Sequence, residues 1–388
     1  MRESERIRCT IYRGGTSKGI FCLENDIPKI PHLRDKLVLR LLGSPDMRQI
    51  DGLGGADPLT SKFVMVGRSS REDADVDYTF AQVSLSTPEV EWTTNCGNLS
   101  GAVGPFAVDE SLVKVVEPFT TVRIYNTNTK KIINATFPVK DGKFSFHGDY
   151  QLAGVPGTGS EIKLEFVDPG GAQTGKLLPT GNVRDKCDMG AGKTIEVTLV
   201  DAANALVCVK AKDIGFKGTE LPSELDGKKE FFQMLENIRG WGSWKLGLAE
   251  SAEKAHIQSP VTPRVAFFAG AQDYRTEDKR IVKKDQIDLL ARLSTGYALT
   301  QMKMHKTYAG TLGIASACAA KLKGSVVFDL LSDESRRSNL VRLGHPFGVM
   351  KFEVKKGEKP LAIDGVRVSR TARRLMEGWA YVPAEIFG

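Results

Sequence analysis

The sequence predicts an α+β protein of two domains. Its 388 residues, of which 41% are hydrophobic, exceed what one typical domain contains. Period-two strand patterns dominate the first half, whereas helical patterns are few. Each half also holds one segment of small residues that opens a helix. These three observations together favour two domains of similar construction.

The strand patterns come with clear turns. Apolar Val76, Tyr78 and Phe80 alternate with polar residues, as in a half-buried strand. The run 126–129, Asn-Thr-Asn-Thr, separates two β-rich segments, and the Asp-Gly pair 141–142 predicts a hairpin. We therefore expect antiparallel strands on both sides of these turns.

Two segments have helical periodicity. Residues 228–239 place Phe231, Leu235 and Ile238 on one face and are expected to stop at Gly240. Residues 284–298 form the second predicted helix. We expect both to cover the outside of a sheet.

The two halves meet near a glycine-rich midpoint and share a helix-opening segment. Pro-Thr-Gly-Asn at 179–182 is the best linker candidate. Aligning Cys96 with Ala309 pairs Gly97 with Gly310, and also Leu99 with Leu312. An internal duplication would explain this correspondence.

Composition narrows the classes of function. The net charge of +7 comes without a run of five Lys or Arg residues, so we expect no nucleic-acid partner and an anionic small molecule instead. No leader or membrane-spanning stretch is visible, so we expect no membrane partner and a cytoplasmic location. The six cysteines lack CxxC pairs and zinc-ligand spacing, which predicts reduced thiols and no metal site.

Cys96 is the first candidate for chemistry. Asn95-Cys96-Gly97-Asn98 precedes a glycine- and alanine-rich helix, where unpaired N–H groups and the helix dipole favour a thiolate and also hold a carboxylate. The alternative is a small buried residue beside a packed turn.

Lys62 is the second candidate. It ends the segment 51–62, whose three glycines would let the backbone approach a ligand, and it enters an apolar β-run. A lysine in a dry pocket loses its proton more easily, which would make it a base. The alternative is an exposed lysine at a strand start.

Two further polar segments are open to more than one interpretation. Thr16-Ser17-Lys18 lies in a glycine-rich run without the phosphate-loop or dinucleotide spacing, so its hydroxyls and cation suit carboxylate oxygens or form a tight surface turn. The basic cluster 370–374 favours a solvated face, with carboxylate binding as the second choice.

Seven segments together indicate a family. In chain order they are RGGTSKG, DGLGGADPLTSK, NCGN, LPTGN, MHKTYAGT, LGHP and RTARRLMEG. Through them, and over nearly its whole length, the chain resembles the PrpF and methylitaconate Δ-isomerase family. No single motif is decisive, but seven in order make accidental similarity improbable.

This resemblance implies a diaminopimelate-epimerase-like fold. In that fold two pseudo-symmetric domains each wrap a curved, mostly antiparallel sheet around a central helix, with the active site in the cleft between them. The implied domains are 1–184 with a C-terminal segment 375–388, and 185–374. The resemblance also implies these substrate-binding residues: Thr16, Ser17, Lys18, Asn95, Gly97, Asn98, Lys306, Gly310 and Thr311.

The resemblance further implies an isomerase that needs no cofactor or metal. Related epimerases use one cysteine from each half, but the second position here is Ala309, which argues against two-thiol epimerisation. Lys62 and Cys96 would instead move a proton along an allylic system, shifting the double bond of methylitaconate, methylaconitate or aconitate. The alternatives are an oxalomesaconate-type tautomerase, a racemase or epimerase, and a non-catalytic carboxylate-binding protein. A homo-oligomer is left open.

Overall fold

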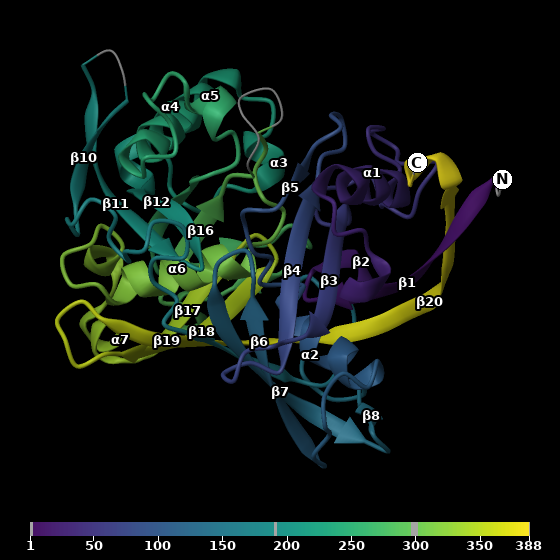
Figure 1. The fold of residues 1–388 in the computed structure, drawn as a ribbon. Helices are drawn as coiled ribbons and strands as arrows, with labels where there is room; N and C mark the ends of the chain where they lie inside the picture. Colours follow the sequence, from purple (N-terminus) through teal and green to yellow (C-terminus); the bar gives the residue numbers. More distant parts are fainter. Residues whose placement is uncertain (1–2, 190–191, 296–301, 388) are drawn as a thin grey trace. The chain divides into compact units, whose positions relative to one another are not determined.

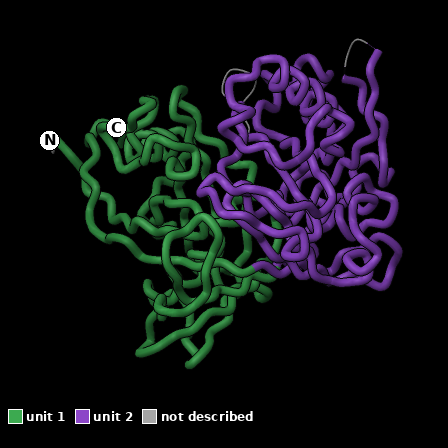
Figure 2. Tube along the Cα trace, turned by 180° about the vertical axis from the view of Figure 1, so that it is seen from behind, with its two compact units in different colours: residues 1–165, 369–388 green, residues 166–368 purple. Residues whose placement is uncertain are grey.

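The computed structural model describes residues 3–189, 192–295 and 302–387. It forms two compact units, shown in Figure 2, which are unit 1 (1–165 and 369–388) and unit 2 (166–368). The predicted domain ends, at 184 and 374, fall later in the chain than the ends of these units.

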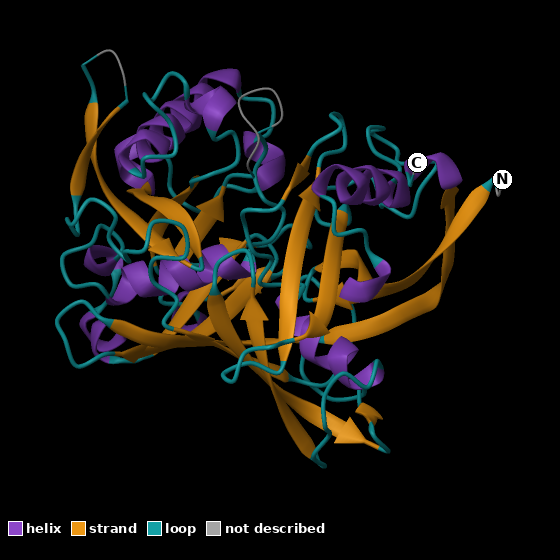
Figure 3. Ribbon diagram, viewed as in Figure 1, coloured by secondary structure: helices purple, strands orange, loops and turns teal. Residues whose placement is uncertain are grey.

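Unit 1 is built mainly from strands (Figures 1 and 3). Its strands are β1 (Ser4–Gly14), β2 (Ser17–Leu23), β3 (Lys62–Arg68), β4 (Val76–Val83), β5 (Val90–Glu91), β6 (Phe119–Asn126), β7 (Lys131–Lys140), β8 (Lys143–Phe144), β9 (Ile162–Val167, ending in unit 2) and β20 (Ala372–Pro383). Its helices are η1 (Glu24–Asp26), α1 (Pro31–Leu42), α2 (Ser100–Asp109) and η5 (Ala384–Ile386). The predicted strand at 76–80 and the turns at 126–129 and 141–142 are confirmed.

Helix α2 is the central helix of unit 1. Its residues 100–108 are all buried, and it packs against β1, β6, β7, β8 and β20. Most pairings in this sheet are antiparallel, including β1 with β20 along nearly their full lengths, although β2 and β3 run parallel. A helix apolar on all sides needs such enclosure, because every face must be removed from water.

Helix α1 covers another part of the unit 1 sheet and is capped by the glycine-rich segment. Leu53 N–H donates to Leu41 O (2.8 Å) and Gly54 N–H donates to Leu42 O (3.2 Å), so the segment satisfies the last carbonyls of the helix. A Cβ on Gly52 would lie 2.1 Å from the nitrogen of Gly43. The expectation that these glycines approach a ligand is thus corrected for Gly52 and Gly54, which approach the end of α1.

Unit 2 repeats the same construction. Its strands are β10 (Asp185–Asp188), β11 (Thr194–Ala202), β12 (Asn204–Lys210), β13 (Arg264–Gly270), β14 (Tyr274–Arg275), β15 (Ile281–Val282), β16 (Leu289–Leu293), β17 (Leu340–His345), β18 (Gly348–Lys356) and β19 (Ile363–Arg370, ending in unit 1). Its helices are η2 (Ala211–Ile214), α3 (Pro222–Leu225), α4 (Lys229–Lys245), α5 (Ala255–Gln258), η3 (Lys284–Gln286), α6 (Gly310–Lys321), η4 (Phe328–Leu330) and α7 (Asp333–Arg337).

Helix α6 is the central helix of unit 2. All of its residues are buried, and it packs against β11, β12, β17 and β18. Helix α4 lies on the other face of β12 and β13. Its apolar side chains, such as Phe231, form a buried cluster there with strand residues that include Val207 and Phe267. Each unit therefore has one enclosed helix and outer helices over its sheet.

The predicted end of the helix at Gly240 is wrong, since α4 continues to Lys245. A Cβ on Gly240 would lie 2.5 Å from Ala252 O, and one on Gly242 would lie 2.6 Å from a methyl group of Val207. These glycines allow close packing of the helix and do not end it.

The predicted helix at 284–298 is also wrong over its described part. Residues 284–286 form the short helix η3, and 289–293 form β16, which is buried at every position. Four of its five residues are apolar, and in a strand covered on both faces periodicity does not separate such a run from a buried helix. Residues 296–298 lie outside the described residues.

Among the helices of the described residues, none has the length and apolarity that crossing a membrane requires.

Candidate active site

Cys96 lies just before the central helix of unit 1. Three turn residues separate it from the first helical residue, Ser100, whose N–H donates to Cys96 O (2.9 Å). The Ser100 hydroxyl also donates to Cys96 O (3.0 Å) and to Asn95 Oδ1 (3.2 Å). Ser100 therefore fixes the backbone on which the thiol stands, and the thiol residue is 8% exposed.

Tyr78 supports the same segment from β4. Its hydroxyl donates to Cys96 O (3.5 Å) from a fully buried position. Burial raises the pKa of Tyr78 well above its ordinary value, and a negative charge on Cys96 would raise it further. The tyrosine stays protonated and remains a donor.

Arg370 lies against the start of α2. The side-chain stem of Arg370 fills the space beside Gly101, since a Cβ there would lie 3.0 Å from Arg370 Cβ. Arg370 is 1% exposed, which corrects the expectation of a solvated face for this residue of the basic cluster.

The guanidinium of Arg370 is buried with few partners. Its Nη1 donates to Ser369 O (2.8 Å), whereas its Nε and Nη2 have no hydrogen-bond partner among the described residues. Burial lowers the pKa of Arg370 to about 10, while the charges of Tyr150 and Cys96 oppose that shift. Arg370 therefore remains a cation at neutral pH.

The hairpin that joins β1 to β2 turns at Gly15 and Thr16, and its Thr16 and Ser17 meet Asn98, which lies just before α2. Asn98 Nδ2 donates to Thr16 Oγ1 (3.0 Å) and to Ser17 Oγ (3.4 Å). Ser17 is 2% exposed, Gly15 is buried and Thr16 is partly buried, so this hairpin is not an exposed surface turn. Lys18 is tied at its backbone, where its N–H donates to Leu59 O (3.0 Å).

Lys62 is the first residue of β3 and is 6% exposed. Its Nζ donates to Gln82 Oε1 (2.6 Å) and lies 5.1 Å from the ring centroid of Phe80. The alternative of an exposed lysine at a strand start is excluded. Gln82 had not been predicted, because its pairing with Lys62 depends on strand register.

Gly19 shows that Lys62 and the α2 segment are neighbours within unit 1. A Cβ on Gly19 would lie 2.9 Å from Leu99 Cδ1 and 3.0 Å from Lys62 O. Unit 1 therefore brings together Thr16 and Ser17, Asn98 near Cys96, and the strand that carries Lys62. The segments that carry the predicted site residues of this unit are therefore neighbours.

The predicted residues of unit 2 lie at the start of α6. Ala309 O accepts a hydrogen bond from Gly313 N–H (2.8 Å), as Cys96 O does from the residue four positions later. Thr311 Oγ1 accepts from Asn204 Nδ2 (2.9 Å), a contact that the sequence had not indicated. Gly310 is buried at the first helical position and Lys306 is exposed in the preceding loop.

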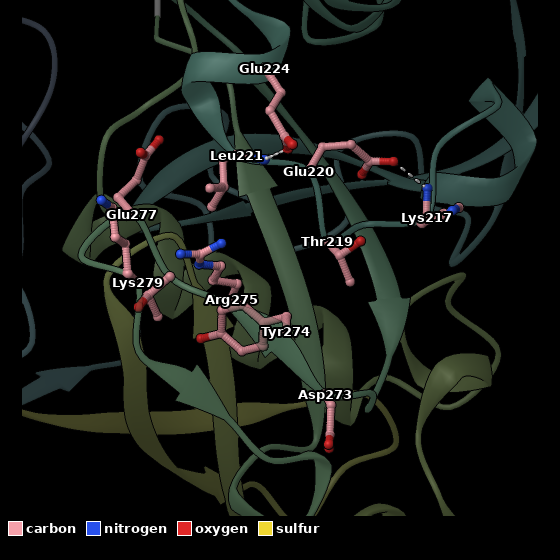
Figure 4. A pocket seen from close by; sticks show the side chains of 11 residues that line it. Lys217, Thr219, Glu220, Leu221, Glu224, Asp273, Tyr274, Arg275, Glu277 and Lys279 are labelled. Atoms are coloured by element: carbon pink, nitrogen blue, oxygen red, sulfur yellow. Dashed lines mark hydrogen bonds between the residues drawn. The ribbon is translucent and has the colours of Figure 1, made fainter.

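A pocket of about 680 Å³ in unit 2 involves none of the predicted residues (Figure 4). Its carboxylates already bind backbone N–H groups, since Glu220 accepts from Lys217 N–H (2.8 Å) and Glu224 accepts from Leu221 N–H (2.7 Å). These glutamates shape a loop. Across the described residues, no group of three or more His, Cys, Asp or Glu side chains is arranged to hold a metal ion.

Known structures identify the class of fold. A crystal structure of methylitaconate-delta-isomerase matches with a TM-score of 0.83 and 44% identity, covering 100% of this chain and 98% of that one. A hydroxyproline epimerase from Agrobacterium vitis matches with a TM-score of 0.57 at 11% identity, covering 99% and 94%, and shows the fold alone. The chain has the diaminopimelate-epimerase-like α+β fold, as predicted.

The family follows from the sequence comparisons. The profile of the PrpF protein family matches residues 4–383, and the chain belongs to this family. The 3-methylitaconate isomerase of Eubacterium barkeri is 46% identical over 98% of both chains. The 2-methyl-aconitate isomerase of Cupriavidus necator is 38% identical, again over 98% of both. The 4-oxalomesaconate tautomerase of Pseudomonas putida is 36% identical over 99% of this chain and 98% of its own.

Proposed function

We propose that this protein is an isomerase that moves a carbon–carbon double bond in a small unsaturated di- or tricarboxylate by a 1,3-proton shift. Methylitaconate, methylaconitate and aconitate are the candidate substrates. The observation that carries the proposal is Lys62, a buried lysine whose Nζ is held by a neutral acceptor beside the Cys96 segment.

Relatives support the reaction class. Proteins named 3-methylitaconate isomerase and 2-methyl-aconitate isomerase match along nearly the whole chain at 46% and 38% identity. The prediction of an isomerase acting on small unsaturated carboxylates is thereby confirmed. The choice among substrates is part of the proposal.

The proposed reaction needs one proton to leave and one to return. A base removes the allylic proton from a carbon next to the double bond, and the electron pair of that C–H bond enters the conjugated system as a dienolate. Reprotonation at the other end of the three-carbon system places the double bond in its new position. Cations and N–H groups stabilise the dienolate most when they are already oriented in a dry site.

Lys62 is the proposed principal acid and base, and Cys96 assists it or positions the substrate. The hydroxyls of Thr16 and Ser17, with Lys18 and the 95–98 segment, are the proposed carboxylate contacts in unit 1. Lys306, Gly310 and Thr311 are the proposed contacts from unit 2. The proposal uses no metal or redox cofactor.

Replacing Lys62 with Ala tests the central assignment. Loss of a general acid–base group lowers a rate by about 10²–10⁴-fold. We expect Lys62→Ala to abolish the uptake of solvent deuterium at the allylic carbons, measured by NMR, with an unchanged circular dichroism spectrum. Lys163→Ala removes an exposed lysine of the same unit and should exchange at the normal rate. Normal exchange by Lys62→Ala would refute the role of Lys62.

A tautomerase is the second candidate, because the 4-oxalomesaconate tautomerase of Pseudomonas putida is 36% identical over nearly the whole chain. The same proton-moving groups would interconvert keto and enol forms. Ultraviolet absorbance separates conjugated from unconjugated products, so assays with each acid in turn decide between the two. Turnover of the oxalomesaconate alone would replace the first proposal.

A further inference from the structure

Gln82 and Lys62 are a directly opposed pair on neighbouring strands. In the antiparallel register of β3 and β4, Lys62 faces Gln82, and Lys62 Nζ donates to Gln82 Oε1 at 2.6 Å. Opposed side chains on one face of a sheet are within reach of each other by construction. The strand register therefore supplies this contact.

The orientation of the Gln82 amide is determined by its other partners. Its Nε2 donates to Pro58 O (3.1 Å) and to Ser61 O (2.9 Å). Backbone carbonyls only accept hydrogen bonds, so the NH₂ group must face them and the amide oxygen must face Lys62. Three hydrogen bonds thus fix the acceptor that Lys62 meets.

This acceptor is neutral. In the part of the chain that the structure describes, no carboxylate lies within ion-pair distance of Lys62 Nζ. A carboxylate partner would stabilise the ammonium and oppose loss of its proton. An amide oxygen accepts an N–H from the ammonium and from the neutral amine alike, so the contact survives proton transfer.

We propose that Gln82 is a positioning residue that keeps the Nζ of Lys62 in one place through both of its protonation states. The inference rests on the proposed role of Lys62. In the neutral amine one N–H binds Gln82 and the lone pair faces the substrate. After Lys62 has taken the allylic proton from the substrate, its nitrogen carries three N–H groups. One of them still donates to Gln82, and the newly acquired proton is available for transfer to the far carbon of the allylic system.

Two substitutions separate positioning from charge. Gln82→Glu places a carboxylate on Lys62, and a charge this close moves a titration by about 1–3 pH units. We expect the rising limb of kcat/KM against pH to move to higher pH by that amount, so that activity at neutral pH falls about 10–1000-fold and returns in alkaline buffer. Gln233→Glu, on the exposed face of α4, makes the same chemical change elsewhere and should leave the profile unchanged.

Gln82→Met removes the acceptor without adding charge. Because a misplaced catalytic group costs up to about 10²-fold, we expect kcat to fall about 10–100-fold while KM changes little and the limb does not move to higher pH. This variant also serves if Gln82→Glu, whose carboxylate would face the Pro58 and Ser61 carbonyls, folds poorly. Thermal unfolding midpoints are recorded for each variant.

The results distinguish this inference from the proposed function. If Gln82→Glu and wild type have the same pH profile, or if Gln82→Met keeps full kcat, the inference about Gln82 is overturned. Normal deuterium exchange by Lys62→Ala would instead overturn the role of Lys62 itself. Loss of exchange in Lys62→Ala with no effect at Gln82 would leave the function intact and remove only the positioning role.

Discussion

Substitution of Gly52 with Ala should destabilise unit 1 by forcing the 51–55 segment away from α1. The added methyl group would lie 2.1 Å from Gly43 N and 2.3 Å from Leu42 C, whereas ordinary contact begins at 3.4 Å. Both obstacles are backbone atoms, so a side-chain rotation does not relieve them. The segment must move by roughly 1 Å to restore ordinary contact with the backbone of α1 and Gly43.

The magnitude follows from the contacts that such a movement breaks. The bonds from Leu53 N–H to Leu41 O (2.8 Å) and from Gly54 N–H to Leu42 O (3.2 Å) would be lost or stretched. Each contributes about 0.5–1.5 kcal/mol. The strain of overpacking adds about 1–3 kcal/mol. We expect the free energy of unfolding of unit 1 to fall by about 2–6 kcal/mol.

Urea unfolding followed by tryptophan fluorescence measures this change. Trp92, partly buried against the apolar cluster of unit 1, reports on the same region as α1. Gly378→Ala is the matched control, because a Cβ there has its nearest neighbour at 3.9 Å, and its midpoint should move by less than the equivalent of about 0.5 kcal/mol. A Gly52→Ala midpoint equal to that of Gly378→Ala would refute the reasoning.

Two other predictions concern buried charges in unit 2. In the wild type, Glu236 Oε2 accepts from Nε of the fully buried Arg239 at 2.6 Å. Glu236→Leu removes this carboxylate partner and should lower the free energy of unfolding, measured by urea titration, by about 3–5 kcal/mol. A loss below about 1 kcal/mol would contradict this expectation. Burial lowers the pKa of Lys321 to about 8, below its value in the unfolded chain, so the unfolded state binds more protons between about pH 8 and 10. The free energy of unfolding of the wild type should therefore rise with pH across that window, and Lys321→Met should remove the part of the rise that is due to this lysine. If the free energy of unfolding rises equally steeply with pH in the wild type and in Lys321→Met, Lys321 is excluded as the cause.

Local patterns in the sequence predicted much of the fold. The strand at 76–80, the turns at 126–129 and 141–142, and both central helix starts depend on alternation, turn residues and small-residue runs that act over a few positions. The errors arose where tertiary packing overrides local preference. Gly240 permits helix packing, and β16, in which four of five residues are apolar, is paired on both edges with β13 and β17.

The candidate site divides in the same way. Cys96 and Lys62 stand out in the sequence through their glycine-rich surroundings. Gln82 does not, because it meets Lys62 through strand register. Arg370 was noted only within a basic cluster expected on a solvated face, because its approach to α2 comes from the far end of the chain. Finding such residues requires knowledge of pairings between distant segments, which periodicity and turn chemistry do not contain.

The two central helices explain why the proposed chemistry depends on unit 1. Cys96 O and Ala309 O each accept a hydrogen bond from the N–H four positions later, at 2.9 and 2.8 Å, although three turn residues separate Cys96 from α2 and Ala309 directly precedes α6. One position carries a thiol and the other a methyl group, which neither donates nor accepts a proton. A symmetrical exchange between two thiols is therefore not available at these positions. The proposed reaction would then need a second titratable group, and we propose Lys62 for it because it is buried, oriented by a neutral amide and adjacent to the Cys96 segment within the same unit.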